Sequence, residues 1–418
     1  MDHLQSDEER KARWYATHLR PRYIDVCRSD ASSATNLADG CVAGIAASLF
    51  ATDADEAKAK RGSQVLHNHL EEYGFAVVTD ALSDKECKVA LGKAWDYLEA
   101  SSAVERQIQA GLSTDPPPVR RNDPSTLSSQ YYPVHVEGGI LPFYGSGHSS
   151  FAWYLRSNPA VQSVFASLYN TTPDKLITSL DGLVLWRAGK EHRTDAGWFH
   201  LDQNPQTKPK FEAVQGLVNL LPVTASTGGN VLVAKSHKLF PHQYTWNSDD
   251  TIGSNSCTSF YRQRLNELRG DDWMEVDPND SYLLYPKNII TCLLNPGDLL
   301  LWDSRTVHCS FPGDDACEDI HGRSRDRGLI RAGGLVSMMP RSRATEEVLK
   351  GRIESVRSSR TLTHWANQCA LLGEEHEEEA LLESRRIEIM KSLETDESKN
   401  KALLWWDDLS PSQKNLVR

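Results

Sequence analysis

Between Leu176 and Pro340 the chain alternates short apolar runs with polar breaks. The runs are "LVLWRA", "VQGLVNLL", "NVLVAK", "IITCLL", "DLLLWDSRTVHCSF" and "LIRAGGLVSMM", and Gly, Pro, Asn and Asp separate them. Short strands at this spacing are typical of an antiparallel barrel or sandwich. The pattern therefore predicts a β-rich core in this part of the chain.

Helix-forming patterns precede this region. Residues 1–64 are rich in Ala and in charged residues, and we predict an N-terminal helical extension there. In "HLEEYGFAVVTDALSDKEC", Gly74 predicts the end of a helix and Phe75–Val78 a short strand. Ser83, followed three residues later by Glu86, predicts a capping box at the start of the next helix.

The patterns together predict one domain over residues 1–418, with an α+β fold. The stretch from Thr114 to Gly147 is rich in Pro, Gly, Ser and Tyr, which predicts a long ordered loop. The predicted parts are the extension at 1–64, a core with supporting helices at 65–343, a partly helical polar insertion at about 241–288 and a helical region at 344–418.

The composition excludes several classes of protein. A net charge of -11 argues against binding to nucleic acid, whose partners usually present a basic surface. The N-terminus "MDHLQSDEERKARWYATHLR" lacks the apolar run of a secretory signal, and no window approaches the length of a membrane span. We therefore expect a soluble cytoplasmic protein whose eight cysteines, none in a CxxC pair, are reduced thiols. Nothing in the sequence predicts the oligomeric state.

Candidate chemistry begins with "GWFHLDQNP". Alternate side chains of a strand share a face, so His200 and Asp202 project to the same side. The strand predicted within "NPGDLLLWDSRTVHCSF" carries His308 near its end. Two histidines and one carboxylate form the facial triad that binds Fe(II) and leaves positions open for reactants. An HxD pair is common by chance, so the prediction depends on the order of strands around it.

That order resembles the phytanoyl-CoA dioxygenase-like (PhyH) branch of the iron(II)/2-oxoglutarate oxygenases, over about Leu66 to Pro340. The resemblance is carried by "YGFAVVTDALSDKEC", "WFHLDQNP", "TGGNVLVAKSHKLF" and "NPGDLLLWDSRTVH". It implies a double-stranded β-helix core, a jelly-roll or cupin-like barrel, and it implies that His200, Asp202 and His308 are the iron ligands.

One turn departs from the family pattern. The turn that is often Pro-Gly-Ser-His in the family appears here as Ala234-Lys235-Ser236-His237. We expect His237 to be a structural turn residue rather than a ligand.

The resemblance also implies 2-oxoglutarate as co-substrate and O2 as oxidant. A guanidinium suits the far carboxylate of 2-oxoglutarate because it offers paired donors and stays charged. Arg331 opens the last predicted strand and matches the family's arginine, whereas Arg323, Arg325 and Arg327 lie in a polar loop. Ser310 lies two residues after His308, so its hydroxyl is expected to face the same cavity.

The resemblance implies an enzyme that oxidises an unactivated C–H bond of a small-molecule substrate and releases succinate and CO2. Hydroxylation is the default outcome, and desaturation or oxidative cyclisation are alternatives. Basic residues near the predicted mouth suggest a carboxylate-like or amino-acid-like substrate: Arg187, Arg193, Lys208 and Lys210. Candidate substrate residues, each equally consistent with a hydrogen-bonded core position, are Trp198, Gln203, Asn204, Gln215, Asn219, Tyr144, His148 and Arg305.

Three other readings remain open. A protein or peptide hydroxylase is one, because the long loop "STDPPPVRRNDPSTLSSQYYPVHVEGG" offers a candidate groove. A non-catalytic ligand-binding barrel is another, although it has no need of His200, Asp202, His308 and Arg331 together. A structural metal module is the third, but such sites usually close four ligands around zinc.

Overall fold

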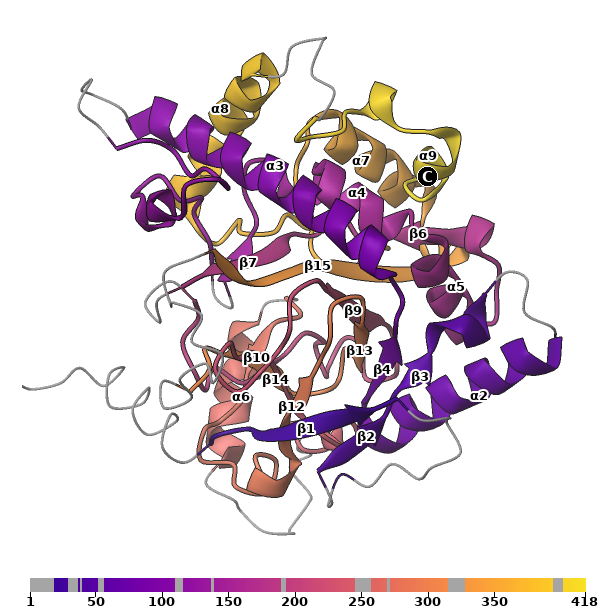
Figure 1. The fold of residues 1–418 in the computed structure, drawn as a ribbon. Helices are drawn as coiled ribbons and strands as arrows, with labels where there is room; N and C mark the ends of the chain where they lie inside the picture. Colours follow the sequence, from indigo (N-terminus) through magenta and orange to yellow (C-terminus); the bar gives the residue numbers. More distant parts are fainter. Residues whose placement is uncertain are drawn as a thin grey trace, which may run out of the picture.

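The computed structural model describes residues 19–28, 37, 40–51, 56–109, 116–136, 139–188, 193–244, 257–268, 271–314, 328–393 and 401–418. Within these residues the fold combines helices with two large β-sheets, one of seven strands and one of eight (Figure 1). The division of the chain into extension, core and C-terminal region stays a prediction.

The seven-stranded sheet has the order β11-β8-β14-β10-β12-β1-β2. Its strands are β1 (Arg22–Cys27), β2 (Cys41–Ala43), β8 (His200–Leu201), β10 (Gly229–Val233), β11 (Met274–Glu275), β12 (Ile289–Leu293) and β14 (His308–Phe311). The eight-stranded sheet has the order β3-β4-β13-β9-β15-β7-β5, and β6 pairs with β15. Its strands are β3 (Ile45–Ala46), β4 (Phe75–Thr79), β5 (Ile140–Leu141), β6 (Leu176–Thr178), β7 (Leu183–Arg187), β9 (Val214–Asn219), β13 (Leu299–Asp303) and β15 (Leu329–Pro340).

The two sheets pack face to face. Leu217 and Trp302 from the eight-stranded sheet share one buried cluster with Leu232 and Ile290 from the seven-stranded sheet. Side chains alternate between the two faces of a strand, so neighbouring residues point away from this shared core. Both faces of each sheet are covered, which explains why strands such as "LLLWD" read as continuous apolar runs.

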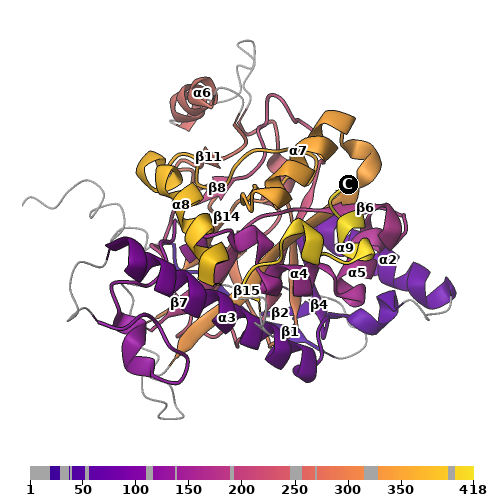
Figure 2. The ribbon, with the colours of Figure 1, turned by 90° about the horizontal axis from the view of Figure 1, so that it is seen from above.

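Helices cover the outer face of the eight-stranded sheet (Figures 1 and 2). Ala76 and Val336 lie in one buried cluster with helix residues such as Leu98 and Val164. The outer face of the other sheet packs instead against the predicted insertion. The helices are α2 (Glu56–Tyr73), α3 (Asp84–Gln109), α4 (Ser150–Arg156), α5 (Pro159–Leu168), α6 (Cys257–Glu267), α7 (Glu346–Arg357), α8 (Glu377–Leu393) and α9 (Pro411–Asn415).

The prediction of helix is wrong for Arg22–Cys27, Cys41–Ala43 and Ile45–Ala46, which are strands. Here β1 pairs in parallel with both β12 and β2, and β3 pairs in parallel with β4. The Ala-rich composition suggested a helix, but the apolar side chains of Ile24 and Val42 are buried in the core between the sheets, and this tertiary contact overrides helix propensity. The predicted helix begins only at Glu56.

Other local predictions are confirmed. The helix α2 ends at Tyr73, and Gly74 follows with φ +82. The Ser83 backbone N–H donates to Glu86 over 2.8 Å, and the Glu86 N–H donates to the Ser83 hydroxyl over 3.4 Å, as in a capping box. The insertion contains α6 and β11.

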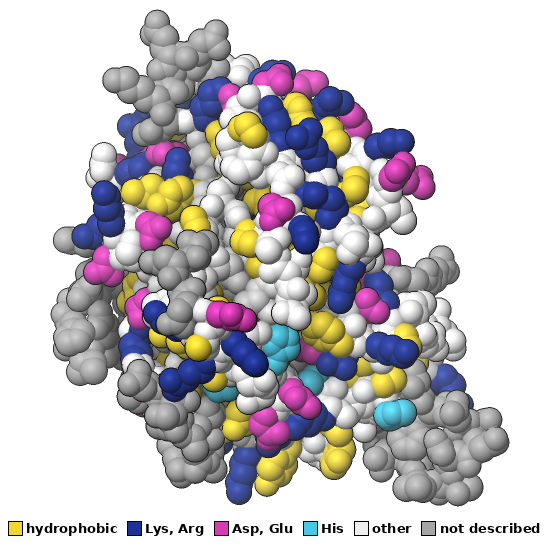
Figure 3. Space-filling model, turned by 90° about the vertical axis from the view of Figure 1, so that its right-hand side faces the viewer, with side chains coloured by type: hydrophobic (Ala, Val, Ile, Leu, Met, Phe, Trp, Pro, Cys, Tyr) yellow, Lys and Arg dark blue, Asp and Glu magenta, His cyan; other side chains and the backbone are white. Residues whose placement is uncertain are grey.

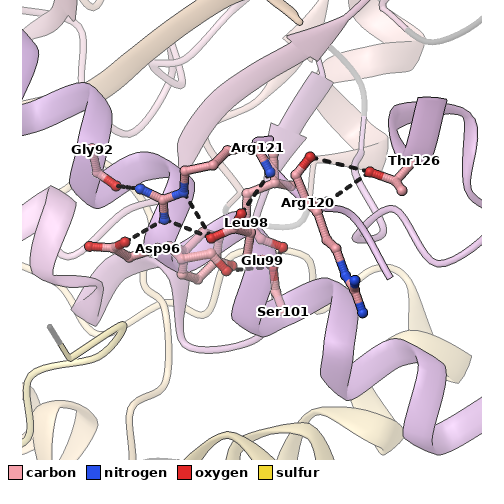
Figure 4. Close-up of polar contacts among 9 residues, drawn as sticks. Gly92, Asp96, Leu98, Glu99, Ser101, Arg120, Arg121 and Thr126 are labelled. Carbon is pink, nitrogen blue, oxygen red and sulfur yellow. Dashed lines mark hydrogen bonds and ion pairs between the residues drawn. The ribbon is translucent and has the colours of Figure 1, made fainter. Parts of the chain in front are cut away.

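The loop that follows α3 is packed onto that helix (Figure 4). The Arg121 backbone N–H donates to Glu99 over 2.6 Å, and its guanidinium also binds Glu99 and Asp96. Tyr131 and Tyr132 further along the loop are buried. The described part of this loop therefore packs against the rest of the fold. It gives no support to the open groove on which the prediction of a peptide substrate depended.

The structure also tests the predictions about the cysteines and about membrane-spanning helices. Cys27 and Cys41 on β1 and β2 form a disulfide with Cα atoms 6.4 Å apart, so the prediction of eight reduced thiols is wrong for this pair. In the part of the chain that the structure describes, no helix combines the length and apolar character needed to cross a membrane. Basic and acidic side chains are interspersed over the face shown in Figure 3.

Candidate metal centre

His200, Asp202 and His308 converge at one end of the space between the sheets. The strands β8 and β14 are neighbours, and His308 pairs directly opposite His200. His308 Nε2 lies 3.2 Å from Asp202 Oδ2, and His200 Nε2 lies 3.5 Å from Asp202 Oδ1. One ligand atom from each of the three side chains lies within 4.8 Å of the others, so a single cation can touch all three.

The second ring nitrogen of each histidine faces a backbone carbonyl. His308 Nδ1 lies 2.9 Å from the carbonyl oxygen of Thr306, and His200 Nδ1 lies 3.2 Å from that of Trp198. Because a carbonyl only accepts, each Nδ1 must carry the proton and donate. Both Nε2 lone pairs are then free to bind a metal, which is the usual arrangement of metal-binding histidines.

Gln215 holds the carboxylate of the triad. Its Nε2 donates to Asp202 Oδ2 over 2.9 Å from the inner face of β9. Burial alone would raise the pKa of Asp202, but His200 and His308 hold it well below its usual range. Burial, followed by the neighbouring His308, lowers the pKa of His200 to about 4. These two shifts favour an anionic Asp202 beside a neutral His200, the protonation states that metal binding needs.

Tryptophan rings frame the two histidines. Trp198 stacks on His200 with ring centroids 4.8 Å apart and an angle of 7°. Trp273, from the insertion, stacks on His200 at 5.6 Å, and Trp302 from β13 lies 5.5 Å from His308. Trp198 was predicted to touch substrate. Its Nε1 donates to the carbonyl of Asp195, and its ring packs against His200, one of the three candidate metal-binding residues.

Arg331 lies deeper between the sheets. Its guanidinium stacks over Trp186, 4.5 Å from the ring centroid, and Nη2 donates to Asn230 Oδ1 over 3.4 Å. Nε and Nη1 are buried without a partner in the described structure. Asn230 pairs with Ser310 across β10 and β14, so Ser310 also faces inward.

This arrangement leaves a buried cation beside an inward hydroxyl. Burial lowers the pKa of Arg331 to about 9 and no carboxylate of the described residues is paired with it, so an anion is the missing partner. Cys309 points the other way, into the cluster behind the sheet, as its position in the strand predicted.

Three predicted substrate residues form local hydrogen bonds, and their contact with substrate stays a prediction. Gln203 donates to the carbonyl of Lys208 and accepts from the hydroxyl of Ser304. Asn204 Oδ1 accepts hydrogen bonds from the backbone N–H groups of Gln206 and Thr207. Asn219 Nδ2 donates to the carbonyls of Leu221 and Asn295.

Tyr144 and His148 are also engaged away from the triad. The Tyr144 hydroxyl donates to Glu105 on α3, and the Tyr144 backbone N–H donates to Glu383 on α8. The His148 ring lies 2.9 Å from the carbonyl oxygen of Arg360. Both residues connect the C-terminal region to the rest of the fold, and their contact with substrate stays a prediction.

Arg305 forms a two-point ion pair with Asp303, at 2.9 and 2.6 Å. It lines a separate hollow of about 660 Å³ with residues such as Glu71 and His237, and none of the three candidate ligands lines that hollow. His237 binds the carbonyl of Glu71 at 3.0 Å, in line with the structural role expected for it.

Most basic residues predicted at the mouth also have other partners. Arg187 donates to the carbonyls of Leu127 and Ser129, and Arg193 donates to those of Ser226 and Pro312. Lys208 forms an ion pair with Asp272, whereas Lys210 is exposed. The side chains Arg323, Arg325 and Arg327 lie outside the described residues.

Sequence reasoning missed Asn230, Trp186 and Trp273. Asn230 joins the site only through the pairing of β10 with β14, and Trp186 only through the pairing of β7 with β15. Neither pairing follows from strand patterns alone. Trp273 lies in the insertion, whose path no motif predicts.

Comparisons with known proteins agree with this geometry. The sequence profile of the family described as phytanoyl-CoA dioxygenase (PhyH) matches residues 188–315, which contain His200, Asp202 and His308. "Ava biosynthesis cluster protein O" of Aspergillus versicolor is 30% identical over 282 residues, covering 66% of this chain and 78% of that protein.

Two solved structures were compared as well. The epimerase SnoN, in complex with Fe3+, alpha ketoglutarate and nogalamycin RO, is 14% identical, with 67% of this chain and 84% of that chain covered and a TM-score of 0.38. EvdO2 from Micromonospora carbonacea var. aurantiaca is 17% identical, with 66% and 90% covered and a TM-score of 0.35.

The family profile and the Aspergillus relative carry the assignment, together with a triad whose donor atoms suit ferrous iron. The chain belongs to the phytanoyl-CoA dioxygenase (PhyH) family of iron(II)- and 2-oxoglutarate-dependent oxygenases.

Proposed function

We propose that this protein oxidises a C–H bond of a small metabolite, with His200, Asp202 and His308 holding iron(II) and Arg331 anchoring 2-oxoglutarate. The observation that carries the proposal is the presence of two features between the sheets, one on each sheet. One is a triad of ligand atoms within 4.8 Å, and the other is a buried guanidinium with two nitrogens unpaired.

The donor set fits iron(II) and 2-oxoglutarate. Two imidazoles and one carboxylate occupy one face of a metal ion and leave positions for a chelating keto acid and for oxygen. A closed zinc site would need a fourth protein ligand, and the cluster of metal-binding side chains found among the described residues has three. When bound, iron(II) with 2-oxoglutarate and O2 supplies the oxidant for the C–H bond, with succinate and CO2 as products.

The residues of the chain hold and orient these groups. The protonated Nδ1 atoms of His200 and His308 donate to backbone carbonyls and aim both Nε2 atoms at one point. Gln215 restrains the Asp202 carboxylate through the 2.9 Å hydrogen bond. Arg331, with Ser310 nearby on β14, offers donors for the far carboxylate of 2-oxoglutarate, and the Trp186 ring fixes the plane of the guanidinium.

We infer that the two facing sheets form a double-stranded β-helix. The antiparallel order β8-β14-β10 in one sheet and β13-β9-β15-β7 in the other supports this reading. In this structure the strands β8 and β14, which carry the histidines, lie in one sheet, and β15, which carries Arg331, lies in the other.

The substrate is proposed to be a small metabolite of a biosynthetic pathway. The Aspergillus relative is named for a biosynthesis cluster, which supports this choice. The engagement of Arg187, Arg193 and Lys208 with other groups removes the main argument for an anionic substrate, so we do not carry that character into the proposal. Hydroxylation remains the default outcome, with desaturation and cyclisation as alternatives.

The test is formation of succinate from 2-oxoglutarate by the purified protein with Fe(II), ascorbate and a broad panel of metabolites. Wild-type protein is expected to form succinate, and His200→Ala and Asp202→Ala are expected to abolish it, because each removes a ligand. Unchanged succinate formation in either variant would refute the assignment of iron to the triad.

A further inference from the structure

A loop from the C-terminal region, residues 361–372, folds back as a small hairpin after α7. Leu362 and Leu371 form a β-bridge, and the Thr363 N–H donates to the carbonyl of Ala370 over 3.0 Å. The Leu362 N–H donates to the carbonyl of Leu180 over 2.8 Å, which ties the hairpin to the β-rich core. We call it the C-terminal loop.

The C-terminal loop lies beside the metal centre. Lys208, six residues after Asp202 in the sequence, sits over the Trp365 ring at 4.1 Å from its centroid and forms an ion pair with Asp272. The same lysine thus joins the loop to the insertion that carries Trp273. Burial lowers the pKa of His364, and the carboxylates of Asp202, Asp181 and Asp272 oppose this shift.

Buried polar atoms without a protein partner gather in this loop. They are Thr363 Oγ1, His364 Nε2, Trp365 Nε1 and Asn367 Oδ1. A buried polar atom that lacks a hydrogen bond is costly, and such atoms are usually paired with protein, water or ligand. Four such atoms within five consecutive residues, in a loop that Lys208 links to the insertion, point to polar groups left for a bound molecule.

Trp273 supplies an apolar surface at the same place. One part of its ring stacks on His200 with centroids 5.6 Å apart, yet the residue is 50% exposed. Exposed tryptophan is expensive to leave in water and favours contact with flat rings. Asp272 and Trp273 are consecutive, so the contact of Lys208 with Asp272 holds this aromatic surface near the C-terminal loop.

We propose that the C-terminal loop and Trp273 form the substrate site of this enzyme, and that they select a small uncharged molecule that carries a flat ring and amide or hydroxyl groups. This inference rests on the proposed function. Asn367 and His364 bind the polar groups of the substrate, and Trp273 stacks on its ring beside the metal. The C-terminal region thereby gains a role in specificity.

The uncharged character follows from the residues of the loop. The sequence "TLTHWANQCALL" contains no lysine, arginine, aspartate or glutamate, so its unpaired atoms are neutral donors and acceptors. Lys208 is already paired with Asp272, and Arg331 is assigned to the co-substrate. A carboxylate placed against this loop would lose water without gaining a cation, which is unfavourable.

The test compares binding of two matched probes by calorimetry, N-acetyl-phenylalaninamide and its carboxylate counterpart N-acetyl-phenylalanine. Binding is measured for the protein alone and for the protein loaded with redox-inactive Mn(II) and 2-oxoglutarate. Wild-type protein is expected to bind the amide more tightly. Thr363→Val and Asn367→Leu, which remove polar atoms at nearly constant size, are each expected to weaken amide binding by about tenfold.

Thermal melting without a probe separates binding from structure. Since the removed atoms have no protein partner, Thr363→Val and Asn367→Leu should melt no lower than wild type. Trp273→Ala should weaken amide binding by about fivefold, whereas Tyr282→Ala, at another exposed aromatic residue of the insertion, should leave it unchanged.

The proposal is overturned by any of three results. Wild-type protein binds the carboxylate at least as well as the amide, or fails to bind the amide. The variants bind the amide as wild type does. The variants melt lower while their affinity is unchanged, which would mean a structural role. If the protein forms no succinate but still binds the amide, the proposed function is contradicted, whereas the proposal of a binding site at the C-terminal loop is not.

Discussion

Arg331 lies over the indole ring of Trp186, 4.5 Å from the ring centroid, on adjacent strands between the two sheets. Arg331 is only 2% exposed. Two nitrogens of its guanidinium have no partner in the described structure. The ring supports the plane of the guanidinium but cannot neutralise its charge. This arrangement supports the proposal that Arg331 binds an anionic group.

Replacing Arg331 by methionine is expected to abolish the stabilisation of the protein by 2-oxoglutarate. The charge-assisted hydrogen bonds to the far carboxylate are lost, so the KM for 2-oxoglutarate should rise by about a hundredfold. The variant without ligand should melt no lower than wild type, because a buried cation without a counter-ion is removed. Thermal melting with and without 2-oxoglutarate, with succinate kinetics, measures both effects.

The matched control for this variant is Arg305→Met. Arg305 is paired with Asp303 and lines the separate hollow. Its loss should leave the KM for 2-oxoglutarate within about twofold of wild type. An equal rise in both variants would mean that Arg331 has no special relation to the co-substrate.

Gln215→Leu is expected to weaken metal binding by about ten- to a hundredfold, as is usual when a residue that orients a ligand is removed. The hydrogen bond from Gln215 Nε2 to Asp202 Oδ2 is lost, and the carboxylate is no longer held toward the histidines. Titration with Mn(II) under calorimetry measures the affinity without turnover.

Asn219→Leu is the control on the same inner face of β9. Asn219 binds the carbonyls of Leu221 and Asn295, away from the triad. This variant should unfold at lower denaturant concentration and bind Mn(II) normally. The account of Gln215 fails if the two variants lose metal affinity equally.

The Glu383 carboxyl predicts a specific dependence of stability on pH. Burial raises its pKa from 4.5 to about 7, although it accepts hydrogen bonds from the N–H groups of Tyr144 and Gly145. A group whose pKa is raised in the folded state stabilises most below the unfolded pKa, and that contribution is lost as pH rises through about 7. The loss is on the order of 3 kcal/mol.

The comparison is between wild type and Glu383→Gln in urea unfolding at pH 5, 6, 7 and 8. The unfolding free energy of wild type minus that of Glu383→Gln should be largest at pH 5 and should decrease toward pH 8. His148, whose pKa burial lowers to about 4, gives the opposite slope in both proteins, so it cancels in the difference. A difference that does not change with pH would show that Glu383 is not protonated in the folded protein.

Some of this structure follows from the sequence because it depends on local alternation. The common face of His308 and Ser310, the outward direction of Cys309 and the capping box at Ser83 all derive from strand or helix periodicity. The triad itself needed the order of motifs along the chain, since spacing alone does not bring His308 beside His200.

Other parts depend on long-range pairing that no local pattern encodes. The segments of β1 and β3 were predicted as helix, but they pair with β12 and β4, and β12 lies far away in the sequence. Gln215 was placed on the correct face, yet only the position of Asp202 shows what it binds. Tyr144 and His148 looked available for a substrate because the residues that hold them, Glu105 and Arg360, are distant in the chain.

The most direct measurement of the central claim is a crystal structure of the protein with Mn(II) and 2-oxoglutarate, prepared without oxygen, with anomalous scattering used to locate the metal. We predict one strong peak about 2.1 Å from His200 Nε2 and His308 Nε2, with Asp202 as the third ligand and the far carboxylate of 2-oxoglutarate on Arg331. A metal peak elsewhere, or 2-oxoglutarate bound away from Arg331, would contradict the account.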